Sequence, residues 1–231
     1  MDARTKKASR TSVPSAPDPF VLHHQRYDNW FERHRAAYLS ELLAVRALLP
    51  WEGRGLEIGV GTGRFAAPLG VTFGIDPAAG MLEHARRRGV RLTRGVAEAL
   101  PFQDAIFDYA LAVTSICFVD NPLAMLQETA RVLRPGGTFV VGLVDRESPL
   151  GQHYLAHQAE SPFYRDAHLF SPAEVEDLLA LAGFGPCTWL QTLFSSSTRS
   201  EEVEPARAGT GDGAFLAGRA RIGTGRKHTV A

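Results

Sequence analysis

The sequence contains little cysteine, no long apolar run and no excess of charge of either sign. Among its 231 residues the two cysteines, Cys117 and Cys187, lie far apart and form no Cys-x-x-Cys pair. This spacing argues against a disulfide framework or a zinc knuckle, so we expect two reduced thiols and no metal site. No apolar stretch approaches the ~20 residues that cross a bilayer. The polar, proline-rich N-terminus lacks the apolar core of a secretory signal, and we therefore expect a cytoplasmic protein.

The balance of charge argues against two classes of partner, nucleic acids and anionic membranes. The chain has 25 lysine and arginine residues against 25 aspartate and glutamate residues, which gives a formal net charge of zero. A general binder of nucleic acid or of anionic membranes would show a basic excess. Hydrophobic residues make up 45% of the chain, enough for a sizeable core. We expect one domain with no nucleic-acid partner and no membrane span, present as a monomer or homodimer.

Strand-like and helix-like segments alternate through the middle of the chain. Short apolar runs that fit buried strands occur at 55–58, 71–75, 90–95, 107–114 and 138–144. Helix-like segments between them occur at 64–69, 78–89 and 122–137. The last of these helices is expected to end at Pro135. This alternation predicts a parallel sheet that is covered by helices on both faces and joined by right-handed crossovers.

The two ends of the chain have different patterns. Helices are expected between 20 and 49, where apolar residues recur at three- and four-residue spacing, and again at 149–160 and 171–183. Ser171 and Glu174 have the spacing of a capping box at the start of the last helix. Two apolar segments at 187–194 and 214–222 flank a polar Gly/Ser-rich loop. They predict an antiparallel strand pair at one end of the sheet.

The stretch LEIGVGTGRF, residues 56–65, is the most informative in the chain. Gly59, Gly61 and Gly63 follow a short apolar strand at every second position. A dinucleotide fingerprint needs Gly-x-Gly-x-x-Gly, and Arg64 stands where its third glycine belongs. A phosphate-binding P-loop would need a Gly-Lys pair, which does not follow. The loop therefore predicts a ligand that is smaller than a dinucleotide and not anionic at this point.

Two acids near this loop indicate what the ligand carries. Asp76 ends the second strand, where a carboxylate can accept hydrogen bonds from the two hydroxyls of a ribose. It can at the same time cap the helix that begins at Pro77. Glu57, expected at the mouth of the loop, repels phosphates and suits a cationic or zwitterionic ligand. A nucleoside with a positive charge and an amino-acid tail meets these conditions, and S-adenosylmethionine is such a molecule.

The segment 56–144 resembles a class I S-adenosylmethionine-dependent methyltransferase, in particular the small-molecule group that includes ubiquinone/menaquinone C-methyltransferases. The motifs that carry the resemblance are LEIGVGTGRF, GIDPAAGML, GVAEALPF, FDYALAVTSICFVDNP and RVLRPGGTFVV. The resemblance implies S-adenosylmethionine as the cofactor. It also implies an α/β, Rossmann-like fold with a seven-stranded, mostly parallel sheet of order 3-2-1-4-5-7-6 and helices on both faces. The seventh strand should be antiparallel.

The same resemblance assigns cofactor contacts residue by residue. Asp76 matches the ribose ligand, and Thr114 matches the position beside the amino-acid tail and the reaction centre. The full set of expected cofactor residues is Glu57, Gly59, Gly61, Gly63, Asp76, Pro77, Met81, Ala97, Glu98 and Thr114. Many relatives have an aspartate where this chain has Val96. Adenine is therefore expected to be held by backbone groups near Ala97, by Glu98, or less tightly than in those relatives.

The resemblance also divides the chain. We expect a disordered tail at 1–19, a methyltransferase domain at 20–222 and a second tail at 223–231. Within the domain, 20–50 should form an N-terminal helical lid and 51–145 the cofactor-binding core. The remaining part, 146–222, should supply substrate-wall helices and the final strand pair.

Segments flanking the core are rich in aromatic and polar side chains that suit a methyl acceptor. Methyl transfer needs alignment and exclusion of water, and it needs a base only where the acceptor must lose a proton. The candidate catalytic residues are His24, His153 and Asp145, although each could equally be a surface, core or ion-paired residue. The expected pocket residues are Tyr27, Trp30, Phe31, Cys117, Phe118 and Tyr154.

The sequence thus predicts an S-adenosylmethionine-dependent methyltransferase that acts on a small, partly apolar acceptor by direct displacement. One alternative is a module that binds S-adenosylmethionine or its demethylated product without turnover. The aromatic, histidine-rich flanks favour the enzyme, because a binding module needs no acceptor pocket. A second alternative is an RNA or protein methyltransferase, against which the neutral net charge counts.

Overall fold

The structure is a computed structural model that describes residues 19–195 and 201–224. The predicted tails lie outside these residues, except for Pro19, which opens helix α1 (Pro19–Leu22), and for 223–224. Part of the Gly/Ser-rich loop, 196–200, also lies outside them. Among the residues described, no helix combines the length and the apolar composition that a membrane crossing requires.

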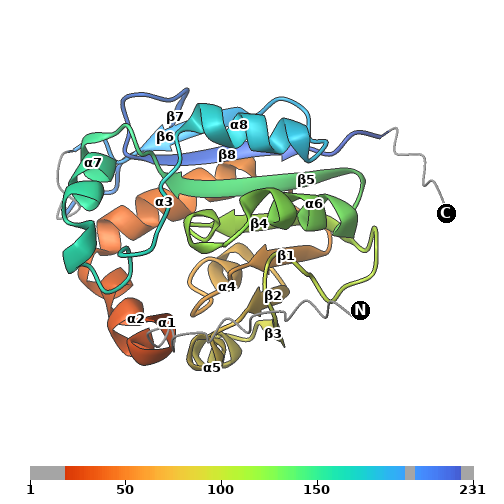
Figure 1. Ribbon diagram of the computed structural model, residues 1–231, viewed down its shortest axis with the longest axis horizontal. Helices are drawn as coiled ribbons and strands as arrows, with labels where there is room; N and C mark the ends of the chain where they lie inside the picture. The colour runs from red at the N-terminus through yellow and green to blue at the C-terminus, as the bar shows by residue number, and fades with distance from the viewer. Residues whose placement is uncertain (1–18, 196–200, 225–231) are drawn as a thin grey trace, which may run out of the picture.

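Within the described residues, eight strands form one sheet in the order β3-β2-β1-β4-β5-β8-β6-β7 (Figure 1). Their bounds are β1 Gly55–Ile58, β2 Phe73–Asp76, β3 Arg91–Arg94, β4 Phe107–Val113, β5 Leu133–Val144, β6 Thr188–Thr192, β7 Arg207–Ala208 and β8 Phe215–Arg221. Strands β1 to β5 pair in parallel, and β8 is antiparallel to both β5 and β6. The predicted fold class is confirmed, and β8 is the predicted seventh strand. The predicted strand number was wrong, because the Gly/Ser-rich loop adds β7, which pairs with β6 through two residues only.

Helices cover both faces of the sheet (Figure 1). The helices on one face are α3 Arg35–Leu48, α4 Ala66–Leu69 and α5 Ala79–Arg87, and those on the other are α6 Pro122–Val132 and α8 Pro172–Leu181. Val45 of α3 and Phe215 of β8 belong to one buried cluster, whereas Met125 of α6 and Phe139 of β5 belong to the second. The sheet is therefore buried on both sides, as its nearly continuous apolar strands require.

Two consecutive N-terminal helices and one helix from the second half of the chain gather beyond the carboxyl ends of the parallel strands, at the left of Figure 1. They are α1, α2 (His24–Arg33) and α7 (Pro149–Ala156). Two short 3₁₀ turns, Ile116–Phe118 and Gln158–Glu160, follow β4 and α7. Ligands of open α/β sheets bind in the crevice at this edge. These elements are therefore placed to cover such a crevice.

The boundary between α6 and β5 differs from the prediction. The helix ends at Val132 and not at Pro135, since Leu133 already has extended dihedral angles and pairs with Phe107 of β4. A residue before proline is disfavoured in helical geometry, so Arg134 favours the strand. The capping box of α8 is confirmed, because the Ser171 hydroxyl and the Glu174 carboxylate each accept a hydrogen bond from the other residue's backbone N–H.

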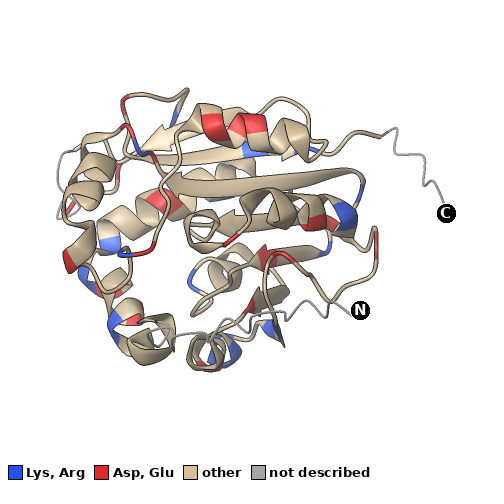
Figure 2. Ribbon diagram, viewed as in Figure 1, with Lys and Arg blue, Asp and Glu red and all other residues tan. Residues whose placement is uncertain are grey.

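Charged side chains are spread over the outside of the molecule. Figure 2 shows acidic and basic residues interleaved on helices and loops around a largely uncharged sheet. Within α5, for example, Arg86 and Arg87 both pair with Glu83, and all three side chains are well exposed. Exposed pairs of this kind contribute about 0–1 kcal/mol each. The fold therefore depends on the two buried clusters more than on such surface pairs.

Gly63 lets α5 lie directly against the loop that follows β1. The residue has a φ of 80°, and a Cβ placed on it would come within 3.0 Å of the Cα and Cβ of Ala85. Gly70, at the end of α4, has a similar φ of 72°, but a Cβ there would meet nothing within 4 Å. The two glycines therefore share a backbone requirement, and only Gly63 also has a packing requirement.

We expect Gly63→Ala to lower the free energy of unfolding by about 1–3 kcal/mol more than Gly70→Ala does. Alanine strains the backbone at both positions because both have positive φ. The added loss at Gly63 comes from overpacking against Ala85. Urea denaturation of the two variants measures the difference, and an equal loss would contradict the close packing of α5 on the loop.

Candidate functional site

The glycine loop and the end of β2 are joined through backbone hydrogen bonds. The N–H groups of Gly59 and Val60 both donate to the carbonyl of Ile75, each at 2.9 Å. One oxygen of the Asp76 carboxylate accepts from the N–H of Gly61 and the other from the N–H of Ala78, again at 2.9 Å. Each carboxylate oxygen has two lone pairs. The side chain is therefore fixed in place and still able to accept from a ligand.

A cavity of about 270 Å³ opens beside this junction. Eight of the ten predicted cofactor residues line it, namely Gly59, Gly61, Asp76, Pro77, Met81, Ala97, Glu98 and Thr114. Among the residues that the structure describes, its charged wall residues are Asp76, Glu98 and Asp120, and neither lysine nor arginine lines it. A site with this composition disfavours phosphate and suits a ligand that carries positive charge.

The other two predicted cofactor residues lie elsewhere. Glu57 is 2% exposed and lies in β1 beneath the loop, so the expectation that it stands at the loop's mouth was wrong. Strands of a parallel sheet are buried on both faces, which places this carboxyl in the interior. Burial raises its pKa well above the usual range, with the charge of Asp76 adding to the effect. Gly63 packs against Ala85 and does not line the cavity.

The far end of the cavity is formed by the segment after β3. Val96, which replaces the aspartate of many relatives, lines the cavity and is 48% exposed. Glu98 accepts hydrogen bonds from the N–H groups of Asp120 and Asn121, at 2.9 and 3.3 Å. It therefore holds the loop after β4 at the edge of the cavity. Contact of Ala97 or Glu98 with adenine stays a prediction.

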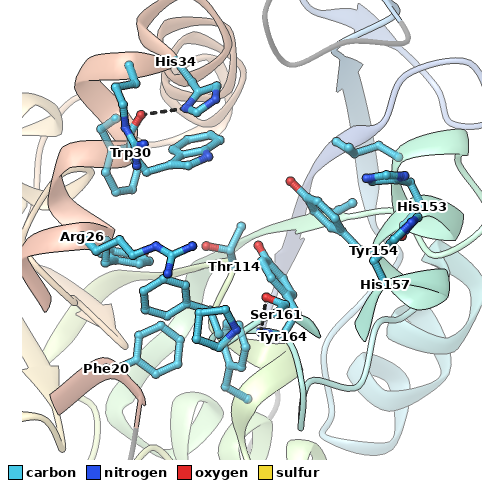
Figure 3. Close-up of a pocket in the computed structure, with 18 of the residues that line it drawn as sticks. Phe20, Arg26, Trp30, His34, Thr114, His153, Tyr154, His157, Ser161 and Tyr164 are labelled. Atoms are coloured by element: carbon cyan, nitrogen blue, oxygen red, sulfur yellow. Dashed lines mark hydrogen bonds between the residues drawn. The ribbon is translucent and has the colours of Figure 1, made fainter. Parts of the chain in front are cut away.

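A second and larger cavity, of about 530 Å³, lies between α2 and α7. Figure 3 shows Trp30 and His34 on one side and Tyr154 on the other, with Tyr164 between them. Five of the six predicted pocket residues line it: Tyr27, Trp30, Phe31, Phe118 and Tyr154. Cys117 was predicted among them but lies beneath its wall, where its thiol donates to the carbonyl of Thr114 at 3.5 Å. Burial raises the pKa of this thiol to about 12, so it is inert at neutral pH.

The three predicted catalytic residues are not brought together. His153 lines the larger cavity, and its ring centroid lies 4.3 Å from that of His157. His24 lines neither cavity, because its Nδ1 lies 2.9 Å from the Nε2 of His84 on α5. Asp145 also lies outside both, since it is 3% exposed and accepts a hydrogen bond from the N–H of Glu147 in the turn before α7. Burial raises the pKa of Asp145.

The two cavities share a wall. Phe20, Tyr27, Thr114 and Phe118 line both of them. Thr114 has a φ of 50°, an unusual conformation for a β-branched residue, and its N–H donates to the carbonyl of Gly142 at 2.7 Å. Burial, and then the carboxylates around it, raise the pKa of Tyr27, which is therefore a neutral phenol at ordinary pH.

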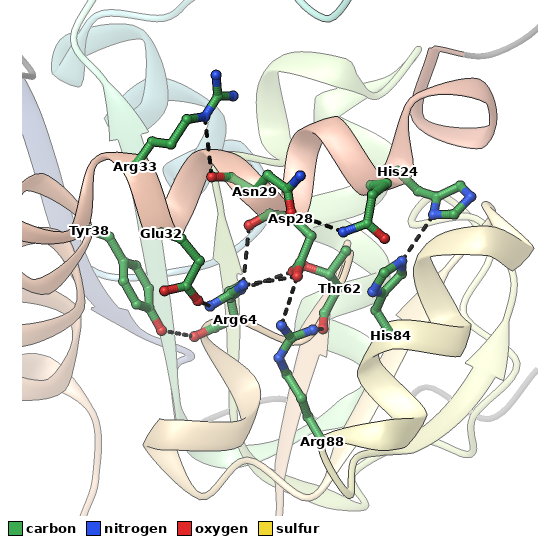
Figure 4. A network of polar contacts seen from close by, with 11 residues as sticks. His24, Asp28, Asn29, Glu32, Arg33, Tyr38, Thr62, Arg64, His84 and Arg88 are labelled. Atoms are coloured by element: carbon green, nitrogen blue, oxygen red, sulfur yellow. Dashed lines mark hydrogen bonds and ion pairs between the residues drawn. The ribbon is translucent and has the colours of Figure 1, made fainter.

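An ion-pair network around the buried Asp28 carboxylate fastens α2 to the glycine loop (Figure 4). Arg64 donates two hydrogen bonds to the Asp28 carboxylate and Arg88 donates one, all at 2.9 Å. Burial alone would raise the pKa of Asp28, but these arginines lower it well below the usual range. The resulting stabilisation is present above the ordinary pKa of an aspartate and is lost as pH falls through the lower, folded value. In the sequence we interpreted Arg64 only as a missing third glycine. A charged residue inside a glycine loop was the signal that could have revealed this ion-pair network.

Comparisons with known proteins agree with this geometry. A family model described as a methyltransferase domain matches residues 56–141. The crystal structure of a Thermotoga maritima S-adenosylmethionine-dependent methyltransferase, named a possible histamine N-methyltransferase, is 49% identical and has a TM-score of 0.85. The match covers 88% of this chain and 97% of that one. This chain belongs to the S-adenosylmethionine-dependent methyltransferases.

Two further relatives of this methyltransferase are known from sequence. An uncharacterised protein of Methanocaldococcus jannaschii is 39% identical over 86% of this chain and 96% of its own length. The malonyl-[acyl-carrier protein] O-methyltransferase of Methylococcus capsulatus is 30% identical over 68% of this chain and 61% of its own. The family model and the T. maritima structure establish the class I fold and the use of S-adenosylmethionine, as the sequence predicted.

The smaller cavity of the methyltransferase fits its cofactor. Backbone, and no side chain, forms the wall at Gly59 and Gly61, and a Cβ on Gly59 would come within 2.5 Å of the Cβ of Ser115. Gly59 therefore cannot carry a side chain, and the cavity is bounded here by backbone alone. The acidic and apolar walls suit a sulfonium and an adenine ring.

We expect Asp76→Ala to weaken binding of S-adenosylhomocysteine by about 1.5–3 kcal/mol, the range for hydrogen bonds to a charged group. Because Asp76 also holds Gly61 and Ala78, the weakening alone does not identify a ribose contact. The 2′-deoxy analogue of the ligand separates the two effects in a double cycle. Removal of the hydroxyl should cost affinity in the native protein and cost nothing further in the variant. Equal costs in both proteins, measured by calorimetry, would contradict the ribose assignment.

Proposed function

We propose that the chain transfers a methyl group from S-adenosylmethionine to a small, partly apolar acceptor in the larger cavity. The observation that carries this proposal is the shared wall. Because Phe20, Tyr27, Thr114 and Phe118 line both cavities, a methyl donor in one and an acceptor in the other would meet there. A module that only binds the cofactor needs no second cavity at this place, so the wall favours the enzyme.

The residues of the chain act mainly by placement. When bound, S-adenosylmethionine supplies a methyl carbon that an acceptor lone pair displaces, with the electrons of the broken bond left on sulfur. Orientation of the two reactants in adjoining cavities can supply roughly 7–11 kcal/mol of the barrier. Aromatic side chains such as Phe20 and Trp30 exclude water from the larger cavity. Tyr27, a neutral phenol at the shared wall, can donate a hydrogen bond to either ligand.

Only one of the three predicted catalytic residues lines the cavity in which the acceptor would bind. We retain His153 as a candidate base, because it lines the cavity in which the acceptor would bind. His24 and Asp145 are not proposed, since neither lines a cavity. We also propose that 20–50 acts as the lid, since residues of α1 and α2 line both cavities. The cytoplasm stays the expected compartment.

The acceptor's chemistry differs among the proteins that this one resembles. The name of the T. maritima relative refers to nitrogen of histamine, and that of the M. capsulatus relative refers to oxygen of a malonyl group. The sequence motifs resemble enzymes that methylate carbon of quinone precursors. An amine, a carboxylic acid and a quinol are therefore the three acceptor classes to compare.

The direct test is turnover. The protein is incubated with S-adenosylmethionine and each acceptor class, and formation of S-adenosylhomocysteine and of a methylated product is measured by mass spectrometry. We expect one class to be methylated, and Gly61→Val to abolish the reaction, because its methyl groups would fill the space between the loop and Tyr27. Binding of S-adenosylhomocysteine without transfer to any class would support the non-catalytic module.

Trp30→Ala should raise the KM for the acceptor about tenfold or more, because the acceptor loses the apolar contact of one aromatic side chain. The affinity for S-adenosylhomocysteine should stay unchanged. Trp30 lines only the larger cavity, where it stacks on His34 with centroids 4.6 Å apart. Trp51→Ala is the matched control, since Trp51 is 86% exposed and lies outside both cavities. Steady-state kinetics distinguish the variants. An unchanged acceptor KM in Trp30→Ala would show that acceptors bind elsewhere.

A further inference from the structure

Glu41 is a buried acid that aims into the larger cavity. It lies in α3, is 7% exposed and lines the cavity wall. Within the described part of the chain, no hydrogen bond or ion pair joins its carboxyl group to another residue. Burial is the one cause that acts on its pKa, which rises to about 8. Since Glu41 is not among the fully enclosed unpaired groups, its carboxyl opens onto the cavity, where a ligand can supply the missing partner.

The surroundings of Glu41 are aromatic. Tyr27, Tyr154 and Tyr164 lie close enough for its charge to raise their own pKa values. Phe20 and Phe163, whose ring centroids lie 5.4 Å apart, line the same cavity. A carboxylate among ring faces attracts a cation in two ways, by direct charge and by cation–π contact. It repels an anion for the same reasons.

We propose that the acceptor is a small amine whose cationic group is bound by the Glu41 carboxylate within these aromatic walls. Before attack the bound ammonium gives one proton to this carboxylate, and the lone pair freed on nitrogen displaces the methyl group from sulfur. The proposal rests on the proposed function, since it names the acceptor class for the same cavity. Glu41 would be the residue that selects an amine over an acid or a neutral ring. It would also orient the acceptor from α3, which supplies this side chain to the cavity wall.

The remaining charged groups of the cavity do not reverse this preference. They come from α2 and the residue that caps it, and from α7 and the turn after it: Arg26, Arg33, His34, His153, His157 and Glu160. All of them are exposed except His34, which is half-buried and hydrogen-bonds to the carbonyl of Trp30 at 3.0 Å. Exposed charges are screened by water and salt, whereas the buried carboxyl is not. The deep part of the cavity therefore prefers a cation.

Binding of a cation should release a proton. Near neutral pH the Glu41 carboxyl is largely protonated, because its pKa is about 8. An ammonium group beside it favours the ionised form, so the pKa falls and the proton leaves to solvent. This proton release is a property of the native protein and needs no variant to observe it.

The experiment compares three probes of one shape and different charge: phenethylamine, phenethyl alcohol and hydrocinnamate. Each is titrated by calorimetry at pH 7 into protein saturated with S-adenosylhomocysteine, in two buffers of different ionisation enthalpy. We expect phenethylamine to bind at least about tenfold more tightly than the other two, as for a hydrogen-bonded charge pair. We also expect it to release most of one proton per protein molecule.

Two variants test whether Glu41 is the residue that binds the cation. Glu41→Gln keeps the shape of the side chain and removes its charge, and we expect it to abolish both the preference for phenethylamine and the proton release. Glu52→Gln is the control, since Glu52 is exposed and lines neither cavity. Binding of S-adenosylhomocysteine shows that each variant is folded.

Three results would overturn the amine assignment while the methyltransferase stands. They are tighter binding of hydrocinnamate or phenethyl alcohol, an unchanged preference in Glu41→Gln, and no binding of any probe to protein that holds S-adenosylhomocysteine. Absence of S-adenosylhomocysteine binding by the native protein would instead contradict the proposed function itself.

Discussion

The ion pairs of Asp28 are the interaction on which the rest of the site depends. This carboxylate joins α2 to Arg64 of the glycine loop and to Arg88 at the end of α5. Loss of one partner of such a part-buried pair leaves an unpaired charge behind and weakens the attachment of α2. Since α2 supplies Tyr27 to both cavities and Trp30 to the larger one, this attachment holds wall residues of both cavities in place.

A rigid attachment of this kind suits a reaction in which the protein's part is to align two ligands. The strand ends fix Asp76 and Thr114 through backbone hydrogen bonds, and the N-terminal helices fix Tyr27 opposite them. The two cavities also differ in the charged side chains that line them. Among the residues described, acidic and no lysine or arginine side chains line the smaller cavity, whereas the buried acid Glu41 lines the larger one together with aromatic rings.

Local rules in the sequence predicted much of this arrangement. The strand GLEI was found at its observed bounds, and the Ser171 capping box was read from spacing alone. Positions that need a particular backbone, such as Gly59 and Gly61, were also identified, because glycine spacing records a conformational requirement directly. The strand at Leu133 was missed, since helix propensity continues through a boundary that pairing with β4 decides.

What the sequence did not reveal depends on tertiary contacts. Glu57 was placed at the loop's mouth, because an acid in a short strand gives no sign of burial on both faces. His24 was placed near the acceptor, but it pairs with His84, sixty residues away in the chain. Glu41 lies in a helix whose apolar spacing indicates core packing, and nothing in that spacing marks a buried acid that faces a cavity.

A crystal structure of the protein with S-adenosylhomocysteine tests the central claim most directly. We expect the ligand in the smaller cavity, with its ribose at Asp76 and its sulfur at the wall formed by Tyr27 and Thr114, facing the larger cavity. A sulfur atom found at the opposite end, near Val96, or a ligand bound outside this cavity, would contradict the meeting of donor and acceptor at the shared wall.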